Sequence, residues 1–275
     1  SDLLKPTLKP GIIIEGAENI QQSITRICNN VDELADYNPD VIFVTVKANV
    51  LPIVASAIKK FYKEGIYVVS WQNGIDTELE LSKVLGKKPV IRGVVNYGCV
   101  FIKPGRVHMH FHHYPHYIQE VDAASKDAVI FIAKVLSECG LETESTDKIL
   151  SMIWRKGVLN ACMNPVCAVT GLTMKQVMSN PVVRKIVEAL FKECVNVARA
   201  NEIFLDWDFY TNGMEYMTKA GSHKPSMLMD IENKRRTEID YINGKYVEYG
   251  RRAGIETPYN EAVISLVKGI EVTFP

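Results

Sequence analysis

Two hydrophobic patterns alternate along the first half of the chain. Residues 41–46 form an unbroken run of β-branched and aromatic side chains after a turn signal, which is typical of a strand buried on both faces of a parallel sheet. Helical spacing follows over residues 51–61, and shorter apolar runs cover residues 66–70 and 90–95. This repetition of strand and helix predicts a doubly wound α/β sheet.

The pattern changes in the second half. Residues 106–112 alternate with a period of two, which indicates an antiparallel or edge strand. From about residue 150 onward only helical periodicity remains, interrupted at glycine and proline positions. We therefore expect a Rossmann-type domain at residues 1–146 and an all-helical domain at residues 147–275, with a ligand cleft between them.

The N-terminal segment lacks the element that opens a dinucleotide-binding fold. Residues 11–16 and 22–28 can form a hairpin, but no strand there leads into a glycine-rich turn and a helix. No two of the 17 glycines are separated by a single residue, so G-x-G does not occur. The sequence thus predicts either a protein that does not bind a dinucleotide or a Rossmann domain that is N-terminally incomplete.

Composition and charge narrow the function classes. The 275 residues are 47% hydrophobic and 23% charged, as in ordinary globular proteins. Thirty-two basic residues balance 32 acidic ones, so nothing favours nucleic acid or an anionic membrane as a partner. Six cysteines without a C-x-x-C pair predict reduced thiols, and no apolar run has the length of a membrane span. We therefore expect a cytoplasmic protein.

The segment from Trp154 to Pro165 carries a distinctive polar stripe. On a helix, Lys156, Asn160 and Asn164 lie at positions i, i+4 and i+8, while the other faces are apolar. Such a stripe faces either solvent or a cleft, and periodicity alone favours solvent. Two short amides beside one lysine, in place of mixed Glu and Lys, favour the cleft.

A second polar segment covers residues 224–244. Pro225 fits the first turn of one helix, and Thr237 with Asp240 predicts the start of another. Glu238 would then lie in a first turn, where a carboxylate stabilises the helix dipole. Taken alone, the pattern favours this structural role for Glu238.

These segments follow one another in a characteristic order. The order is Val46-Lys47-Ala48-Asn49, Gln72-Asn73-Gly74, Trp154-Arg155-Lys156 with its two asparagines and Pro165, Ser226-Met227, and Thr237 to Gly244. From about Gly11 to Glu271 the chain closely resembles the ketopantoate reductase (2-dehydropantoate 2-reductase) family. The resemblance implies an N-terminal Rossmann domain and a C-terminal helical domain of the 6-phosphogluconate dehydrogenase-like kind. It also implies NADPH-dependent reduction of ketopantoate to pantoate, on the route to pantothenate and coenzyme A.

The resemblance also implies roles for individual side chains. A lysine ammonium can stabilise the charge on a reduced ketone oxygen and donate a proton to it, while amide and hydroxyl groups hold a 2-oxo acid in one orientation. The implied assignments are Lys156 as the catalytic general acid, Glu238 as the active-site glutamate, Asn160, Asn164 and Ser226 as substrate-binding residues, and Lys47 with Asn73 as cofactor-binding residues.

Two departures from the family leave alternatives open. The first strand and its glycine-rich turn are absent, as if roughly the first 50 residues were missing, a length beyond ordinary loop variation. The exposed sheet edge that this implies favours self-association, for example as a homodimer. The second departure is a histidine-rich strand at residues 108–116, for which we expect no metal because no nearby Cys or carboxylate completes a ligand set.

Two other functions compete with ketopantoate reduction. One is a non-catalytic fragment or descendant that acts as a binding or dimerising module, which the missing turn favours. The other is a reductase of a different branched 2-oxo acid, because the motifs contact the oxo acid group and not its side chain.

Overall fold

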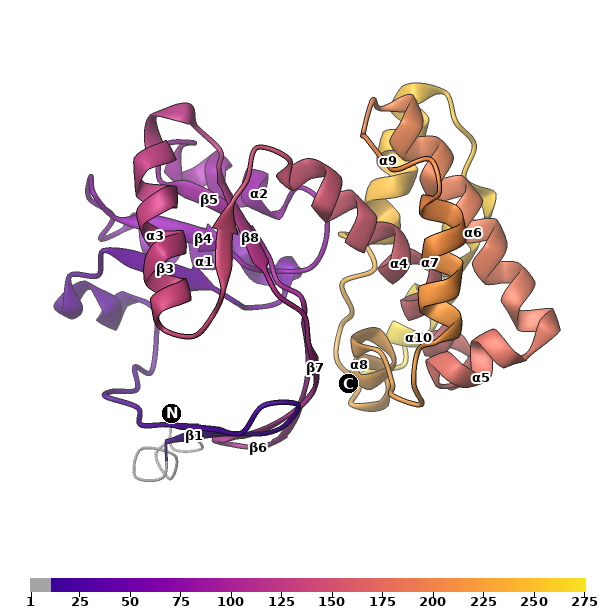
Figure 1. Cartoon of the computed structure of the whole chain (residues 1–275), viewed down its shortest axis with the longest axis horizontal. Coiled ribbons are helices and arrows are strands. Elements are labelled where there is room, and N and C mark those ends of the chain that lie inside the picture. The colour runs from indigo at the N-terminus through magenta and orange to yellow at the C-terminus, as the bar shows by residue number, and fades with distance from the viewer. Residues whose placement is uncertain (1–10) are drawn as a thin grey trace. The chain divides into compact units, whose positions relative to one another are not determined.

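The computed structural model of the chain describes residues 11–275, and these fall into two compact units (Figure 1). One unit comprises residues 11–46, 50–72 and 78–149. The other comprises residues 150–275 together with two short segments, 47–49 and 73–77. The sequence predicts a single boundary after residue 146, and the first ten residues of the predicted N-terminal domain lie outside the described part. Each unit is described by itself.

A five-stranded sheet forms the centre of the first unit. Its strand order is β3-β4-β5-β8-β9; β3, β4 and β5 are parallel, β8 is antiparallel to β5, and β9 is parallel to β8. The strands are β3 (Val41–Val44), β4 (Tyr67–Ser70), β5 (Val90–Val94), β8 (His116–Glu120) and β9 (Thr143–Ser145). This sheet confirms the predicted α/β fold class.

Three α-helices accompany this sheet in the same unit. They are α1 (Leu51–Lys59), α2 (Thr77–Leu85) and α3 (Lys126–Glu138). In addition, 3-10 turns cover Asp32–Tyr37 and Ala123–Ser125, and a further one, Ala48–Val50, joins the segment 47–49 of the other unit to α1. Helix α3 buries Val129, Ile132 and Ala133, which recur at helical spacing. They join Val69 and Ile91 of the sheet in one hydrophobic cluster, so α3 covers a face of the sheet.

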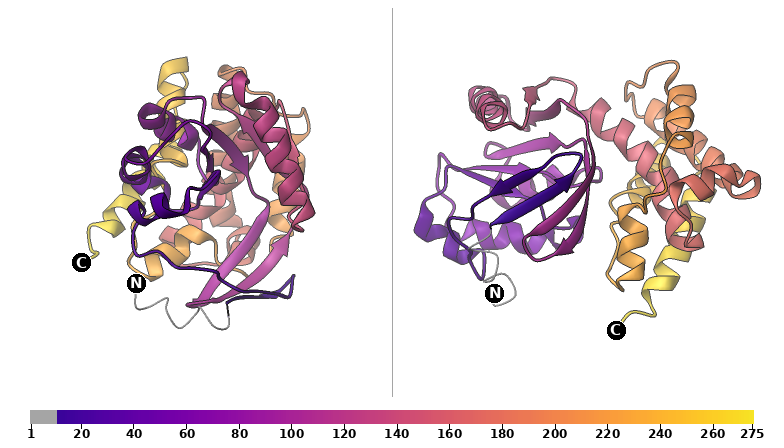
Figure 2. Two further views of the ribbon diagram at one scale, coloured as in Figure 1. Left: turned by 90° about the vertical axis from the view of Figure 1, so that its left-hand side faces the viewer. Right: turned by 60° about the horizontal axis from the view of Figure 1, so that its bottom comes forward.

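A second, four-stranded sheet in the first unit differs from the sequence prediction (Figure 2). Its order is β2-β1-β7-β6, with strands β1 (Ile12–Gly16), β2 (Ile20–Gln22), β6 (Tyr97–Lys103) and β7 (Arg106–His112). The hairpin from Gly11 onward exists, but its second strand ends before most of the predicted segment 22–28. The prediction of an antiparallel strand at residues 106–112 is confirmed, because β6 pairs with β7 in antiparallel. The edge alternative was wrong, because β1 pairs with β7 in parallel on its other side.

The second unit contains only helices, which confirms the predicted all-helical C-terminal part. They are α4 (Ile149–Thr170), α5 (Met174–Ser179), α6 (Pro181–Ala200), α7 (Phe209–Thr218), α8 (Ser226–Glu232), α9 (Asn243–Ala253) and α10 (Pro258–Glu271). Within residues 11–275, no helix combines the length and apolarity that crossing a membrane requires.

Helix α4 runs through Pro165 without ending there. Proline has no N–H, so the carbonyl oxygen of Ala161, four residues earlier, loses its usual intrahelical donor. The buried Asn243 side chain at the start of α9 donates to this oxygen at 2.9 Å. The asparagine thus replaces the missing helical hydrogen bond and joins α9 to α4.

Candidate active site

The predicted polar stripe lies on α4. Lys156 and Asn160 are half-buried, and Asn164 is buried. Two contacts with α9 hold the same stretch of α4: the Tyr246 hydroxyl donates to the carbonyl oxygen of Trp154 at 3.1 Å, and Gly157 leaves room for that hydroxyl. The stripe is therefore carried by a helix that is fixed on its apolar side.

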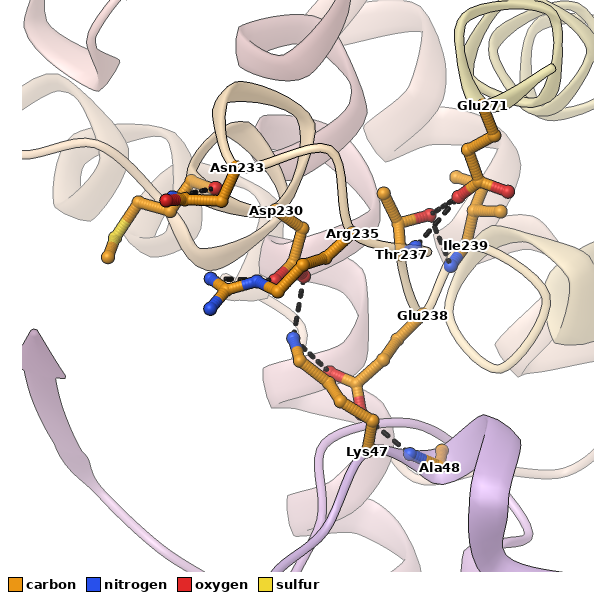
Figure 3. A network of polar contacts seen from close by, with 10 residues as sticks. Lys47, Ala48, Asp230, Asn233, Arg235, Thr237, Glu238, Ile239 and Glu271 are labelled. Carbon is orange, nitrogen blue, oxygen red and sulfur yellow. Dashed lines mark hydrogen bonds and ion pairs between the residues drawn. The ribbon is translucent and has the colours of Figure 1, made fainter. Parts of the chain in front are cut away.

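Lys47 joins two acidic side chains from the helical part of the chain (Figure 3). Its Nζ lies 2.6 Å from Asp230 Oδ2 and 3.5 Å from Glu238 Oε2. The lysine side chain is 38% exposed, whereas those of Asp230 and Glu238 are 3% and 6% exposed. Arg235 also contacts Asp230, at 3.3 Å. Buried carboxylates require compensating charge, and Lys47 supplies it to both.

Glu238 lies in an irregular segment and not in the first turn of a helix. The helix predicted to start at Thr237 is wrong, because α9 begins at Asn243. Thr237 instead donates from its backbone N–H and its hydroxyl to Glu271 of α10, at 2.7 and 2.6 Å. Glu238 accepts from the backbone N–H of Ala48 at 2.9 Å. Its carboxylate therefore accepts from the first residue of the 3-10 turn Ala48–Val50, which leads into α1, and not from a helix that begins at Thr237.

The segment that contains Asn73 is attached to the same helical part of the chain. The N–H of Ile75 donates to the carbonyl oxygen of Tyr241 at 3.0 Å. Gly74 has φ +102°, and a Cβ there would lie 2.9 Å from that oxygen. Asp76 accepts from the Tyr249 hydroxyl and pairs with Lys245, each at 3.0 Å. Asn73 itself is half-buried.

The structure brings some of the predicted residues together. Lys47 and Glu238, 191 positions apart, are in contact. Lys156, Asn160 and Asn164 share α4, Ser226 is the exposed first residue of α8, and Asn73 lies in the segment after β4. The sequence analysis assigned no role to Asp230 or Asp76. The only local signal is their position: Asp230 lies four residues after Ser226, and Asp76 lies three residues after Asn73.

The histidine-rich strand does not form a metal site in the described residues. Nε2 of His112 and Nε2 of His116 lie 2.9 Å apart, and His116 Nδ1 accepts from the backbone N–H of Asn96. Throughout residues 11–275, no group of three or more His, Cys, Asp or Glu side chains is arranged to hold a metal ion. These imidazoles instead hydrogen-bond across the connection from β7 to β8.

Comparisons with known proteins extend over most of the chain. Residues 4–123 match the family described as ketopantoate reductase PanE/ApbA, and residues 148–271 match its C-terminal part. The chain is 30% identical to the 2-dehydropantoate 2-reductase of Archaeoglobus fulgidus, over 96% of this chain and 85% of the relative. It is 29% identical to the same enzyme of Pyrococcus horikoshii, over the same shares.

Solved structures give a matching result. A D-mandelate dehydrogenase in ternary complex with NADH and anilino(oxo)acetate has a TM-score of 0.87 and 25% sequence identity, covering 99% of this chain and 88% of the dehydrogenase. A 2-dehydropantoate 2-reductase of Geobacter metallireducens also has a TM-score of 0.87, at 23% identity. The matched family and these relatives are oxidoreductases.

Proposed function

Because the chain belongs to the ketopantoate reductase family, we propose that it reduces ketopantoate to pantoate, with NADPH as the cofactor and Lys156 as the general acid. The observation that best supports this proposal is the contact between Lys47 and Glu238. The family resemblance assigns both residues to the reductase site. Lys47 Nζ and Glu238 Oε2 lie 3.5 Å apart although 191 positions separate the two residues.

The residues present fit one end of a nicotinamide dinucleotide. Lys47 and Asn73 follow the carboxyl ends of the adjacent parallel strands β3 and β4, where such folds bind their ligands. The ammonium of Lys47 is partly exposed and Asn73 is half-buried. No G-x-G exists among the 17 glycines to approach the pyrophosphate. We therefore assign only the nicotinamide end to these two side chains.

The chemistry that the chain supplies is proton transfer and orientation. The bound nicotinamide supplies the hydride for the ketone carbon. Lys156 then stabilises the negative charge on the ketone oxygen and donates a proton to it, so that the alcohol forms. Asn160, Asn164 and Ser226 hold the carboxylate and hydroxyl groups of the substrate, which restricts the ketone to one orientation. Glu238 keeps Lys47 and the backbone of Ala48 in place.

The direct test is an assay with the protein expressed from its complete coding sequence, including any codons upstream of Ser1. We expect loss of NADPH absorbance that depends on ketopantoate, with pantoate as the product. NADH serves as the cofactor control. If the protein folds and binds NADPH but reduces no 2-oxo acid, the proposal is wrong and the non-catalytic alternative holds.

A second candidate substrate class has its own support. The structural likeness to a D-mandelate dehydrogenase, at 25% identity, favours a test of aromatic 2-oxo acids. Phenylglyoxylate, the 2-oxo acid that corresponds to mandelate, should be assayed beside ketopantoate and 2-oxoisovalerate. A larger kcat/KM for phenylglyoxylate would keep the reaction type and change the physiological substrate.

Cofactor affinity gives a separate prediction for the 275-residue chain. Lys47 and Asn73 cannot replace the backbone N–H groups of a phosphate-binding turn, so we expect NADPH to bind weakly, with a Kd on the order of 1 mM or above. Calorimetric titration of this chain measures it. A micromolar Kd would show that another part of the chain binds the pyrophosphate.

Self-association of the 275-residue chain, for example as a homodimer, is a separate proposal. Strand β3 is an edge of the five-stranded sheet, and its Phe43 is 40% exposed. An exposed edge with apolar side chains favours pairing with a second chain. Sedimentation velocity at micromolar concentration distinguishes dimer from monomer.

A further inference from the structure

The turn at residues 73–77 is held by an unusual aspartate. Asp76 is only 7% exposed and has φ +64°, in the left-handed region that aspartate and asparagine adopt more readily than other residues with a side chain. A buried carboxylate persists only where its partners compensate the cost of its burial. The proposed reductase site gives Asp76 no role, since the family resemblance assigns only Asn73 in this turn.

The partners of Asp76 come from helix α9. The Tyr249 hydroxyl donates to Oδ1 at 3.0 Å and lies 3.2 Å from Oδ2, while Lys245 Nζ lies 3.0 Å from Oδ2. Lys245 also pairs with Glu248 at 2.8 Å, so one ammonium joins two carboxylates. Burial, together with the charge and hydrogen bond of Asp76, raises the pKa of Tyr249 to about 12, which keeps the hydroxyl protonated as a donor.

Helix α9 contacts the Lys156 helix through the same tyrosine. The ring of Tyr249 packs edge-on against Trp154, with ring centroids 5.0 Å apart. Trp154 lies two residues before Lys156 on α4, and its carbonyl oxygen accepts from Tyr246. Tyr249 therefore contacts the Asn73 turn with its hydroxyl and the Lys156 helix with its ring.

We propose that Asp76 is a positioning residue, which anchors the turn at residues 73–77 to α9 and thereby holds Asn73 in register with Lys156. This proposal rests on the proposed function for its consequence in catalysis, but the anchoring itself does not. The backbone supports it, because the N–H of Ile75, the residue before Asp76, also bonds to the segment that precedes α9.

The first experiment tests the anchor without a substrate. Hydrogen exchange is followed in the 275-residue chain and in the variants Asp76→Asn and Tyr249→Phe. Asparagine tolerates the left-handed backbone but lacks the charge, and phenylalanine keeps the ring but not the donor. We expect exchange at residues 74–77 to accelerate about tenfold or more in both variants, the scale for loss of a charge-assisted hydrogen bond.

The matched control is Tyr259→Phe, which removes a hydroxyl from an exposed tyrosine of α10. Exchange at residues 74–77 should stay as in the unchanged chain. If Asp76→Asn and Tyr249→Phe also leave this exchange unchanged while the rest of the chain remains protected, Asp76 does not anchor the turn and the proposal is overturned.

The second experiment tests positioning by a double-mutant cycle in the protein from the complete coding sequence. Asp76→Asn should lower kcat about tenfold while KM for the 2-oxo acid changes less than about threefold, since a small misplacement of a positioned group mainly reduces turnover. In an Asn73→Ala background, the same substitution should lower kcat less than about twofold.

The two experiments separate two kinds of failure. An equal loss of kcat with and without Asn73 would mean that Asp76 supports the fold generally, which overturns the proposal. If the unchanged protein reduces no 2-oxo acid, the proposed function fails, and the exchange data still decide whether Asp76 anchors the turn.

Discussion

Two short segments, residues 47–49 and 73–77, occupy equivalent positions after neighbouring strands, but the charged side chain that each contributes has the opposite sign. Each follows one of the adjacent parallel strands β3 and β4, and each belongs to the helical unit. In segment 47–49, the ammonium of Lys47 pairs with Asp230, and the backbone N–H of Ala48 donates to Glu238. Segment 73–77 contributes the carboxylate of Asp76 and receives a hydroxyl and an ammonium from α9.

Exposure distinguishes what the two segments can do. The side chain of Lys47 is 38% exposed although both of its partners are buried, so part of this side chain is in contact with solvent. In the pair of Asp76 with Lys245, both side chains are largely buried, at 10% and 15% exposure. In the proposed function, the first segment offers Lys47 to the cofactor, whereas the second segment is held by its charge and offers the uncharged Asn73.

The largest expected effect tests whether the chemistry lies on α4 and not on either segment. Lys156→Ala should lower kcat about 100-fold or more in the protein from the complete coding sequence, the usual scale for loss of a general acid. Lys192→Ala, which removes an exposed lysine of α6, is the control and should stay within about twofold. Steady-state kinetics with ketopantoate measure both. Equal activity with alanine at position 156 would remove that lysine from the mechanism.

The next effect concerns the close approach of the second segment to Tyr241. Gly74→Ala places a Cβ 2.9 Å from backbone and side-chain atoms of Tyr241, at φ +102°. Gly65 has a similar φ of +98° but nothing within 4 Å of such a Cβ, so Gly65→Ala carries only the backbone strain. We expect about 3 kcal/mol of destabilisation for Gly74→Ala and about 1 kcal/mol for Gly65→Ala.

Urea denaturation of the 275-residue chain measures these two losses of unfolding free energy. The difference between them isolates the steric contact, because both variants pay for a left-handed alanine. Equal losses would show that segment 73–77 relaxes away from Tyr241 at little cost.

The sequence predicted the parts of this comparison that depend on local spacing. The run at residues 41–46 and the helical spacing after it gave β3 and α1, and the i, i+4 stripe placed Lys156 and Asn160 on one helix. The motif order gave the family, which the matches over both halves confirm. The strand, the helix and the stripe each depend on spacing within one element, whereas the family depends on the order of motifs from Val46 to Gly244.

The contacts that define the two segments were not predictable in this way. Asp230 contacts Lys47, 183 positions away, and Asp76 contacts Tyr249, 173 positions away. No local sequence pattern indicates contacts at such separations. The helix expected at Thr237 failed for the same reason, because Glu238 is held by Ala48 and Thr237 by Glu271. Likewise, β7 is a central strand of its sheet only because it pairs with β1, more than 90 residues earlier in the sequence.

A smaller effect tests the first segment. Glu238→Ala leaves the buried N–H of Ala48 without its acceptor, which should destabilise the 275-residue chain by about 2 kcal/mol. Glu238→Gln keeps an amide oxygen in place and should cost less than about 1 kcal/mol, because the partly exposed Lys47 retains Asp230.

The control for this pair is Glu232→Ala, which removes an exposed carboxylate paired with Lys224 and should stay within about 0.5 kcal/mol. Equilibrium unfolding in urea gives all three values. If Glu238→Gln costs as much as Glu238→Ala, the charge toward Lys47 outweighs the hydrogen bond to Ala48, and the first segment is held mainly by ion pairing.

The smallest expected effect is a pH dependence of the contact between the second segment and Tyr249. The pKa of Tyr249 rises from 10.0 to about 12, through burial and the Asp76 carboxylate. A group whose folded pKa is raised contributes stability that is present below its unfolded pKa and is lost as the pH rises through the folded value. The difference in unfolding free energy between the unchanged chain and Tyr249→Phe should therefore become smaller between pH 10 and pH 12. Since the tyrosine is half-exposed, solvent screening limits the narrowing to about 1 kcal/mol. Urea unfolding of both chains at intervals over this range measures this narrowing, and a constant difference would show that folding does not raise the pKa of Tyr249.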